Sequence, residues 1–141
     1  MATQATILLV EDNPDDERLA VRALRRANIS AEILIARNGE EALATVFNAN
    51  CLPIVMILDL KLPKIDGLDV LRAIRANAKT RLLPVVILTS SSEQRDIIDS
   101  YDLGANSYVR KPIEFDRFTE AVGQLAIYWT GINEPITLES I

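Results

Sequence analysis

The sequence alternates between short, uninterrupted apolar runs and longer amphipathic stretches. Four apolar runs are clear and a fifth is weaker, and they occupy residues 5–10, 31–36, 54–58, 84–89 and 106–109. Runs of this length without polar alternation are typical of strands buried on both faces, as in parallel sheets. Helix-like stretches separate them, so the pattern predicts a strand followed by a helix five times over. We therefore expect an α/β fold with one five-stranded parallel sheet.

The first predicted helix carries clear signals at both ends. Asn13 is a favourable N-cap residue, and Pro14 then stands at the first helical position. Asp15 and Asp16 lie at the positive end of the helix dipole, and residues 25–26, both arginine, lie at the negative end. We interpret the two aspartates as helix-stabilising residues and not as part of a reactive site. The later helices are predicted over Glu40–Asn48, Leu68–Asn77, Glu93–Tyr101 and about Glu114 to Trp129.

The length and composition indicate one globular domain. The chain has 141 residues, of which 49% are hydrophobic, enough for one sizeable core. No internal linker, low-complexity segment or repeat interrupts the alternation of strands and helices. We expect the domain to cover residues 1–130, with residues 131–141 as a C-terminal tail and no second domain.

Charge and residue usage narrow the classes of function. The net charge of −5 argues against nucleic acid or an anionic membrane as a partner, and no apolar stretch is long enough to span a membrane. The single cysteine, Cys51, excludes an internal disulfide and fits a cytoplasmic location. The sequence contains no histidine, so any chemistry must use carboxylates, hydroxyls and lysines.

Polar residues follow the apolar runs where the predicted strands end. Glu11 and Asp12 follow the first run, and Asp59 follows the third. Thr89 ends the fourth run, and Lys111 comes shortly after the fifth. Because the carboxyl ends of parallel strands lie along one edge of a sheet, we expect these five side chains to meet there.

Three converging carboxylates need a cation, since two of them about 4 Å apart repel by about 4 kcal/mol at an effective dielectric constant of about 20. Oxygen ligands without histidine or thiolate favour Mg²⁺. Mg²⁺ and Lys111 could neutralise an incoming phosphoryl group while Asp59 attacks it and forms an aspartyl phosphate. Each residue also has a simpler explanation, because acids at strand ends often cap helices and Thr89 is an ordinary strand former. The presence of all of them at four strand ends favours the reactive site.

Four segments in order, "LLVEDN", "ILDLKLPKIDGLDVLR", "VVILTS" and "GANSYVRKPIE", resemble the response-regulator receiver domains of two-component signalling. The resemblance covers about Thr6 to Trp129. It implies a doubly wound, flavodoxin-like sheet with strand order 2-1-3-4-5. Residues 1–130 would then be the receiver domain, with no output domain attached.

The resemblance also implies roles at the metal site. Asp59 would be the phosphoacceptor, and Asp12 would bind Mg²⁺ directly, with Mn²⁺ or Ca²⁺ as substitutes. Glu11 would act through a coordinated water, and the backbone carbonyl of Lys61 would complete the protein ligands. Glu11 stands where an aspartate is common in the family.

Further residues would bind the phosphoryl group or respond to it. Thr89 would donate a hydrogen bond to it and Lys111 would form an ion pair with it. Tyr108 falls at the aromatic switch position, although an aromatic residue on a strand is also an ordinary core residue. Lys61 and Ser91 fall at positions that tune dephosphorylation. The bond between Lys111 and Pro112 is expected to be cis.

The segments "EDNPDDERL" and "FDRFTEAVGQLAIYWTGINEP" resemble more narrowly the small regulators partnered with cyanobacterial phytochrome kinases. This implies a phytochrome-type histidine kinase as partner and a homodimer. A receiver without an output domain equally fits a chemotaxis-type regulator or a relay carrier. We expect the dimer to form through the fourth helix, fifth strand and fifth helix.

The last predicted helix has an apolar stripe that would pack mainly on the sheet, formed by Phe115, Phe118, Val122, Leu125 and Trp129. Further apolar surface lies beside the stripe and would suit the dimer interface; it is formed by Ala121, Ile127 and Tyr128.

Three other functions fit less well. An Asp-x-Asp phosphatase would need a second carboxylate where Lys61 stands. A flavin or nucleotide module would need a Gly- or Ser/Thr-rich phosphate loop, whereas "EDNPDDE" is acidic. The remaining alternative is a pseudo-receiver, a dimeric interaction module that keeps the fold without phosphorylation.

Overall fold

A computed structural model describes residues 5–136 and contains one five-stranded parallel sheet. The strands are β1 (Thr6–Val10), β2 (Glu32–Ala36), β3 (Val55–Leu58), β4 (Val85–Thr89) and β5 (Ser107–Arg110). Their order across the sheet is β2-β1-β3-β4-β5, and all four pairs are parallel. This confirms the predicted fold class and strand order.

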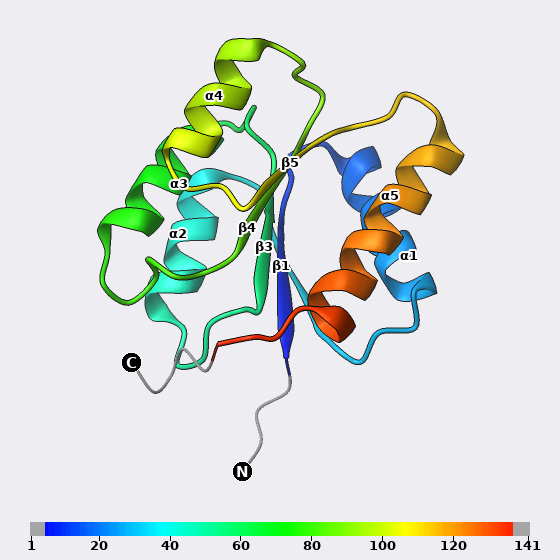
Figure 1. The fold of residues 1–141 in the computed structure, drawn as a ribbon, viewed down its shortest axis with the longest axis horizontal. Helices are drawn as coiled ribbons and strands as arrows, with labels where there is room; N and C mark the ends of the chain where they lie inside the picture. Colours follow the sequence, from blue (N-terminus) through cyan, green and yellow to red (C-terminus); the bar gives the residue numbers. More distant parts are fainter. Residues whose placement is uncertain (1–4, 137–141) are drawn as a thin grey trace.

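Helices cover both faces of the sheet, with α1 and α5 on one side and α2, α3 and α4 on the other (Figure 1). The helices are α1 (Pro14–Arg26), α2 (Gly39–Asn48), α3 (Gly67–Ala76), α4 (Gln94–Asp102) and α5 (Phe115–Ile127). Between residues 5 and 136, no helix has both the length and the apolar character needed to cross a membrane.

The core consists of two apolar layers, one on each face of the sheet. Alternate residues of β1 enter different layers, because successive side chains of a strand point to opposite faces. Ile7 and Leu9 pack in the layer that contains Phe118 of α5, whereas Leu8 and Val10 pack in the layer that contains α2 and α3 residues. The strands are therefore buried on both sides, as their unbroken apolar sequence predicts.

The ends of the strands are level along one edge of the sheet. Val10 is aligned with both Ala36 and Leu58, so the residues that follow these strands begin side by side. The backbone N–H of Glu11 donates to Ala36, and that of Asp59 donates to Val10, over 3.0 and 3.1 Å. The first polar residues after β1 and β3 are thus fixed as neighbours by backbone hydrogen bonds.

The start of α3 packs closely against the end of β3. The N–H of Gly67 donates to the carbonyl of Leu60 over 2.8 Å. A Cβ atom at Gly67 would lie 2.3 Å from the carbonyl oxygen of Asp59, so only glycine allows this approach. The loop after β3 is therefore held close to the edge that carries Asp59.

The ends of the helices agree with the sequence signals at α1 but not at α5. The side chain of Asn13 accepts hydrogen bonds from the N–H groups of Asp15 and Asp16, which confirms the N-cap. The last helix changes at Tyr128 into a π-helical segment, η1 (Tyr128–Ile132), which crosses the boundary expected after residue 130. Residues 137–141 of the expected tail lie outside the described residues.

The apolar stripe of α5 is only partly buried. Phe118 and Val122 lie in the core together with Ala126, which the predicted stripe did not include. Leu125 and Trp129 are half-buried and pack against this layer. Phe115, the first residue of the helix, is 45% exposed and lies outside both core layers.

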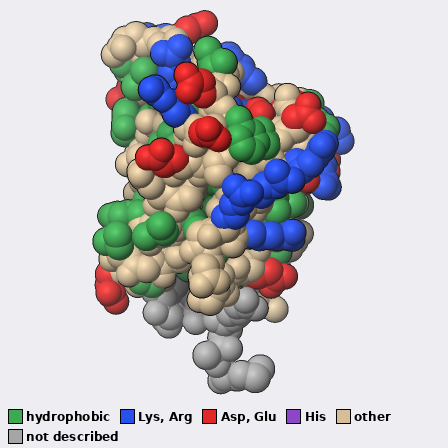
Figure 2. Space-filling view, turned by 90° about the vertical axis from the view of Figure 1, so that its right-hand side faces the viewer, with side chains coloured by type: hydrophobic (Ala, Val, Ile, Leu, Met, Phe, Trp, Pro, Cys, Tyr) green, Lys and Arg blue, Asp and Glu red, His purple; other side chains and the backbone are tan. Residues whose placement is uncertain are grey.

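Arginines are concentrated beside α1 although the whole chain is acidic. Figure 2 shows Lys and Arg side chains in a row on the face of the molecule that carries α1 and α5. A hollow of about 620 Å³ is lined by Arg18, Arg22, Arg25 and Arg37 together with Pro14, Glu17, Val21 and Ile35. Ion pairs with Glu17 and Asp15 partly neutralise Arg37 and Arg18. The net charge of −5 therefore conceals a local basic surface.

Candidate functional site

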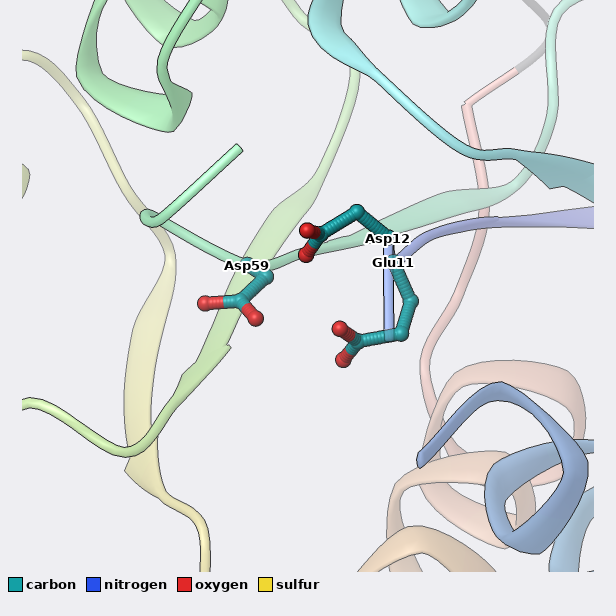
Figure 3. A group of neighbouring side chains, drawn as sticks. All are labelled: Glu11, Asp12 and Asp59. Carbon is teal, nitrogen blue, oxygen red and sulfur yellow. The ribbon is translucent and has the colours of Figure 1, made fainter. Parts of the chain in front are cut away.

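Three carboxylates meet at the edge where β1 and β3 end. Glu11, Asp12 and Asp59 each offer an oxygen atom within 4.8 Å of the other two. Figure 3 shows their carboxylate groups turned toward the same space. Glu11 and Asp59 are buried, whereas Asp12 is exposed, so the cluster is open to solvent on one side. The oxygen-only donor set suits a hard cation such as Mg²⁺ or Mn²⁺.

Lys111 is the positive group of the cluster. Its Nζ atom lies 2.6 Å from Glu11 Oε1 and 2.9 Å from both Asp59 Oδ2 and Asp16 Oδ2. The side chain is only 9% exposed. Because β4 separates β5 from β3 in the sheet, the long lysine side chain extends past one strand to reach the acids.

The burial of these charges changes their protonation. Burial raises the pKa of Glu11 to about 7, with a smaller rise from the charge of Asp59 and an opposing effect of the hydrogen bond from Lys111. For Lys111, burial acts against the charged form, but the hydrogen bonds to Glu11 and Asp59 outweigh it and raise its pKa above the usual value. The lysine therefore stays charged at neutral pH, while Glu11 can gain or lose a proton there.

Asp16 belongs to this cluster, which the sequence interpretation missed. Its place in the first turn of α1 predicted only a helix-stabilising role. Its carboxylate also binds Lys111. The available signal was its position: α1 begins directly after β1, so its first turn lies at the same edge as the strand ends.

Thr89 and Tyr108 lie on the two strands beyond β3. Thr89 is fully buried, and its carbonyl accepts a hydrogen bond from the N–H of Lys111 over 2.6 Å. The hydroxyl of Tyr108 donates to the carbonyl of Ser91 over 2.9 Å, and burial raises the pKa of the phenol. Tyr108 is half-buried and packs against the α2–α3 core layer. Tyr108 is therefore part of the core and also contacts the loop after β4.

Lys61 and Ser91 lie two residues beyond Asp59 and Thr89. The N–H of Lys61 donates to Asp59 Oδ1 over 3.3 Å, and the N–H of Ser91 donates to Thr89 Oγ1 over 3.5 Å. These contacts bring both residues to the edge of the cluster. That the carbonyl of Lys61 binds a metal stays a prediction.

The bond between Lys111 and Pro112 is trans, so the expected cis bond is wrong. No peptide bond among residues 5–136 is cis. Trans is favoured by about 0.5–1 kcal/mol even before proline. The trans chain already lets Lys111 contact Thr89 through its backbone and the three acids through its side chain.

A family model described as "response regulator receiver domain" matches residues 7–123. Among curated proteins, the response regulator Rcp1 of Synechocystis sp. (strain ATCC 27184 / PCC 6803 / Kazusa) is 36% identical over 137 residues, covering 94% of this chain and 91% of Rcp1. The probable methanogenesis regulatory protein FilR2 of Methanothrix harundinacea (strain 6Ac) is 37% identical over 131 residues, covering 90% of this chain and 84% of FilR2. The similarity thus extends over most of each of these proteins.

Two similar solved structures share the fold closely. The Mn²⁺-bound form of Rcp1 has a TM-score of 0.88 and 34% identity, covering 94% of this chain and 99% of that chain. The phosphorylated cyanobacterial phytochrome response regulator RcpA has the same score, identity and coverage. Both identities are high enough to compare the site as well as the fold.

The Lys111 contacts generate a stability prediction. We expect Lys111→Met to lower the free energy of unfolding by about 3 kcal/mol near pH 8, because it leaves buried carboxylates without a counter-ion. Acidification should restore part of the loss as Glu11 takes up a proton. Urea denaturation of the metal-free protein measures both effects.

Lys64→Met is the matched control, since Lys64 forms an exposed ion pair with Glu40. It should leave the denaturation midpoint almost unchanged. Equal midpoints for the two variants would contradict the importance of the Lys111 contacts.

Proposed function

Because this chain belongs to the family of response regulator receiver domains, we propose that it accepts a phosphoryl group from a histidine kinase on Asp59 in a Mg²⁺-dependent reaction. The main support is the position of Asp59, whose carboxylate is buried between two further acids and the ammonium of Lys111. A nucleophilic carboxylate needs a nearby cation to bind an anionic phosphoryl group.

Asp12 and Asp59 would hold Mg²⁺ directly, Glu11 through a water, and Lys61 through its carbonyl. Receiver domains bind Mg²⁺ or Mn²⁺ at an acidic site, and the similar Rcp1 has been solved with Mn²⁺. The metal would supply charge neutralisation for the phosphoryl oxygens. Ca²⁺ is a further proposed substitute.

In the transfer, an oxygen of Asp59 attacks the phosphorus of the kinase phosphohistidine, and the phosphorus–nitrogen bond breaks as the acyl phosphate forms. Lys111 would pair with the transferred group, and Thr89 would donate a hydrogen bond to it. Hydrolysis then returns Asp59 and inorganic phosphate. The protein would catalyse its own phosphorylation and dephosphorylation as a signalling protein, not as an enzyme with a separate substrate.

The signal would leave through α4, β5 and α5. The added charge would draw Thr89 and its loop toward Asp59, and Tyr108 would repack because its hydroxyl binds the carbonyl of Ser91 in that loop. A phytochrome-type sensor is our proposed kinase, supported by the similarity to RcpA and to the bacteriophytochrome response regulator AtBRR.

Phosphorylation tests the proposal. With Mg²⁺ and acetyl phosphate, we expect intact mass spectrometry to show one added phosphoryl group on the wild type and none on Asp59→Asn. EDTA should abolish the addition. A wild type that takes up no phosphoryl group and binds no beryllofluoride would favour the pseudo-receiver alternative.

The pKa of Glu11 predicts how Mg²⁺ affinity depends on pH. A carboxylate must lose its proton to act at a metal site, so affinity should fall by about tenfold per pH unit below the pKa of about 7. Calorimetric titration at several pH values between about 6 and 8 measures this. Glu11→Gln, which cannot titrate, should show a much flatter profile; equal slopes for the two proteins would contradict the role of Glu11.

A homodimer through the same surface is also part of the proposal. Apolar side chains are exposed on it, namely Ile98 and Tyr101 of α4, Ile127 at the end of α5 and Tyr128 at the start of η1. A groove of about 660 Å³ between β5 and α5 includes Val109, Leu125 and Trp129 in its lining. Unpartnered apolar surface of this kind suits a two-fold interface.

We expect sedimentation at high micromolar concentration to show a dimer that Ile127→Glu disrupts. Ile113→Glu is the control, because Ile113 is 98% exposed in the loop before α5 and lies outside this surface. A wild type that stays monomeric with and without phosphorylation would contradict the dimer.

A further inference from the structure

Asp96, in the first turn of α4, joins two loops that leave neighbouring strands. The hydroxyl of Ser91 donates to Asp96 Oδ2 over 2.6 Å. The ammonium of Lys61 lies 3.9 Å from the same oxygen. The Asp96 side chain is only 15% exposed, whereas that of Lys61 is 67% exposed. We call these three residues the Asp96 bridge.

Both ends of the Asp96 bridge lie next to the proposed phosphorylation site. Lys61 binds Asp59 through its backbone, and Ser91 binds the hydroxyl of Thr89 in the same way. Strands β3 and β4 are adjacent, with Leu58 aligned to Ile87, so their loops leave the sheet side by side. Asp96 therefore completes a chain of contacts that begins at Asp59 and ends at Thr89.

We propose that Asp96 is a positioning residue that slows the hydrolysis of phosphorylated Asp59 by holding the side chains of Lys61 and Ser91 together. This inference rests on the proposed function. In the hydrolysis step, the oxygen of a water attacks phosphorus from the side opposite the Asp59 oxygen. The phosphorus–oxygen bond to Asp59 breaks, its electron pair returns to the carboxylate, and a proton of the water is released with inorganic phosphate.

Asp96 would slow hydrolysis by restricting the access of water to the phosphorus atom. The attacking water must approach from beyond the phosphoryl group, on the outer side of the two loops that carry Lys61 and Ser91. By contacting both side chains, Asp96 would hold the two loops together and so narrow this approach. Lys61 and Asp96 also line a hollow of about 380 Å³ together with residues of the loop after β3, which gives a released Lys61 side chain room to move.

The Asp96 bridge also includes a residue of the surface proposed to carry the signal, so this surface could influence the lifetime of the phosphoryl group. Asp96 belongs to α4, and Tyr108 of β5 donates to the carbonyl of Ser91. A movement of α4 or Tyr108 would therefore change the bridge. A partner that binds α4 would be expected to alter the rate of hydrolysis, as coupling between sites is reciprocal.

The test compares Asp96→Ala and Asp96→Asn with the wild type. Each protein is phosphorylated with acetyl phosphate and Mg²⁺, the donor is removed, and loss of the phosphoryl group is followed by intact mass. We expect Asp96→Ala to lose it about tenfold faster, which is the lower end of the effect of a hydrogen bond to a charged group. Asp96→Asn keeps a hydrogen-bond acceptor but not the charge, and should lie between Asp96→Ala and wild type.

Asp99→Ala is the matched control, because Asp99 lies in the same helix and forms an ion pair only with Arg95 among the described residues. It should hydrolyse at the wild-type rate. Adding Lys61→Met to Asp96→Ala should give no further acceleration, since the contact is already lost. A general loosening of α4 would instead let the two effects multiply.

An Asp96→Ala rate equal to or slower than wild type, with normal phosphorylation of both proteins, would overturn this inference alone. Multiplying effects in the double variant would also overturn it. A wild type that accepts no phosphoryl group would overturn the proposed function and this inference with it. Thermal denaturation of Asp96→Asn guards against a folding defect as the cause.

Discussion

The contact of one buried ammonium with three carboxylates is the interaction on which the functional edge of this protein depends. Lys111 lies within 2.9 Å of Glu11, Asp16 and Asp59, and two of these acids are buried. Without the lysine, like charges would face each other where little water screens them. One ammonium cannot balance these acids and Asp12 as well, so the edge keeps a negative charge that a divalent cation would relieve. Proton uptake by Glu11 is the other way to relieve it, and it is favoured because burial, with a smaller contribution from the charge of Asp59, raises the pKa of Glu11.

The fold places these charged side chains at the end of the core, where burial destabilises the charged form and where the side chains of neighbouring strands meet. The strands are apolar on both faces, so the first polar residues after them mark the end of the core. Parallel strands bring these residues to one edge, and backbone hydrogen bonds fix Glu11 and Asp59 side by side. A phosphoryl group on Asp59 would compete with the other acids for Lys111. Phosphorylation and metal binding are therefore expected to depend on each other through this lysine.

Local patterns predicted the five-stranded parallel sheet and most of the cluster, whereas the strand order was implied by the family resemblance. The apolar runs predict the strands, and the ends of these runs predict where Glu11, Asp12 and Asp59 meet. The contact of Asp16 with Lys111 was missed because an acidic residue in the first turn of a helix is already explained by its effect on helix stability. The contacts of Asp96 depend on how α4 docks beside two loops, which no local pattern reveals. The cis bond expected from the family resemblance was wrong. The change of the last helix to a π-helical segment at Tyr128 was not predicted either, because the apolar pattern of the helix carries no signal for it.

The most direct test of the central claim is to locate the acyl phosphate. Borohydride reduces an aspartyl phosphate to homoserine, so treating the phosphorylated protein and sequencing its peptides by mass spectrometry identifies the residue that carried the group. We predict homoserine at position 59 alone, in a reaction that requires a divalent cation. Reduction at Asp12 or Asp16, or no reduced residue in a protein that had gained a phosphoryl group, would contradict the assignment of Asp59 as the acceptor.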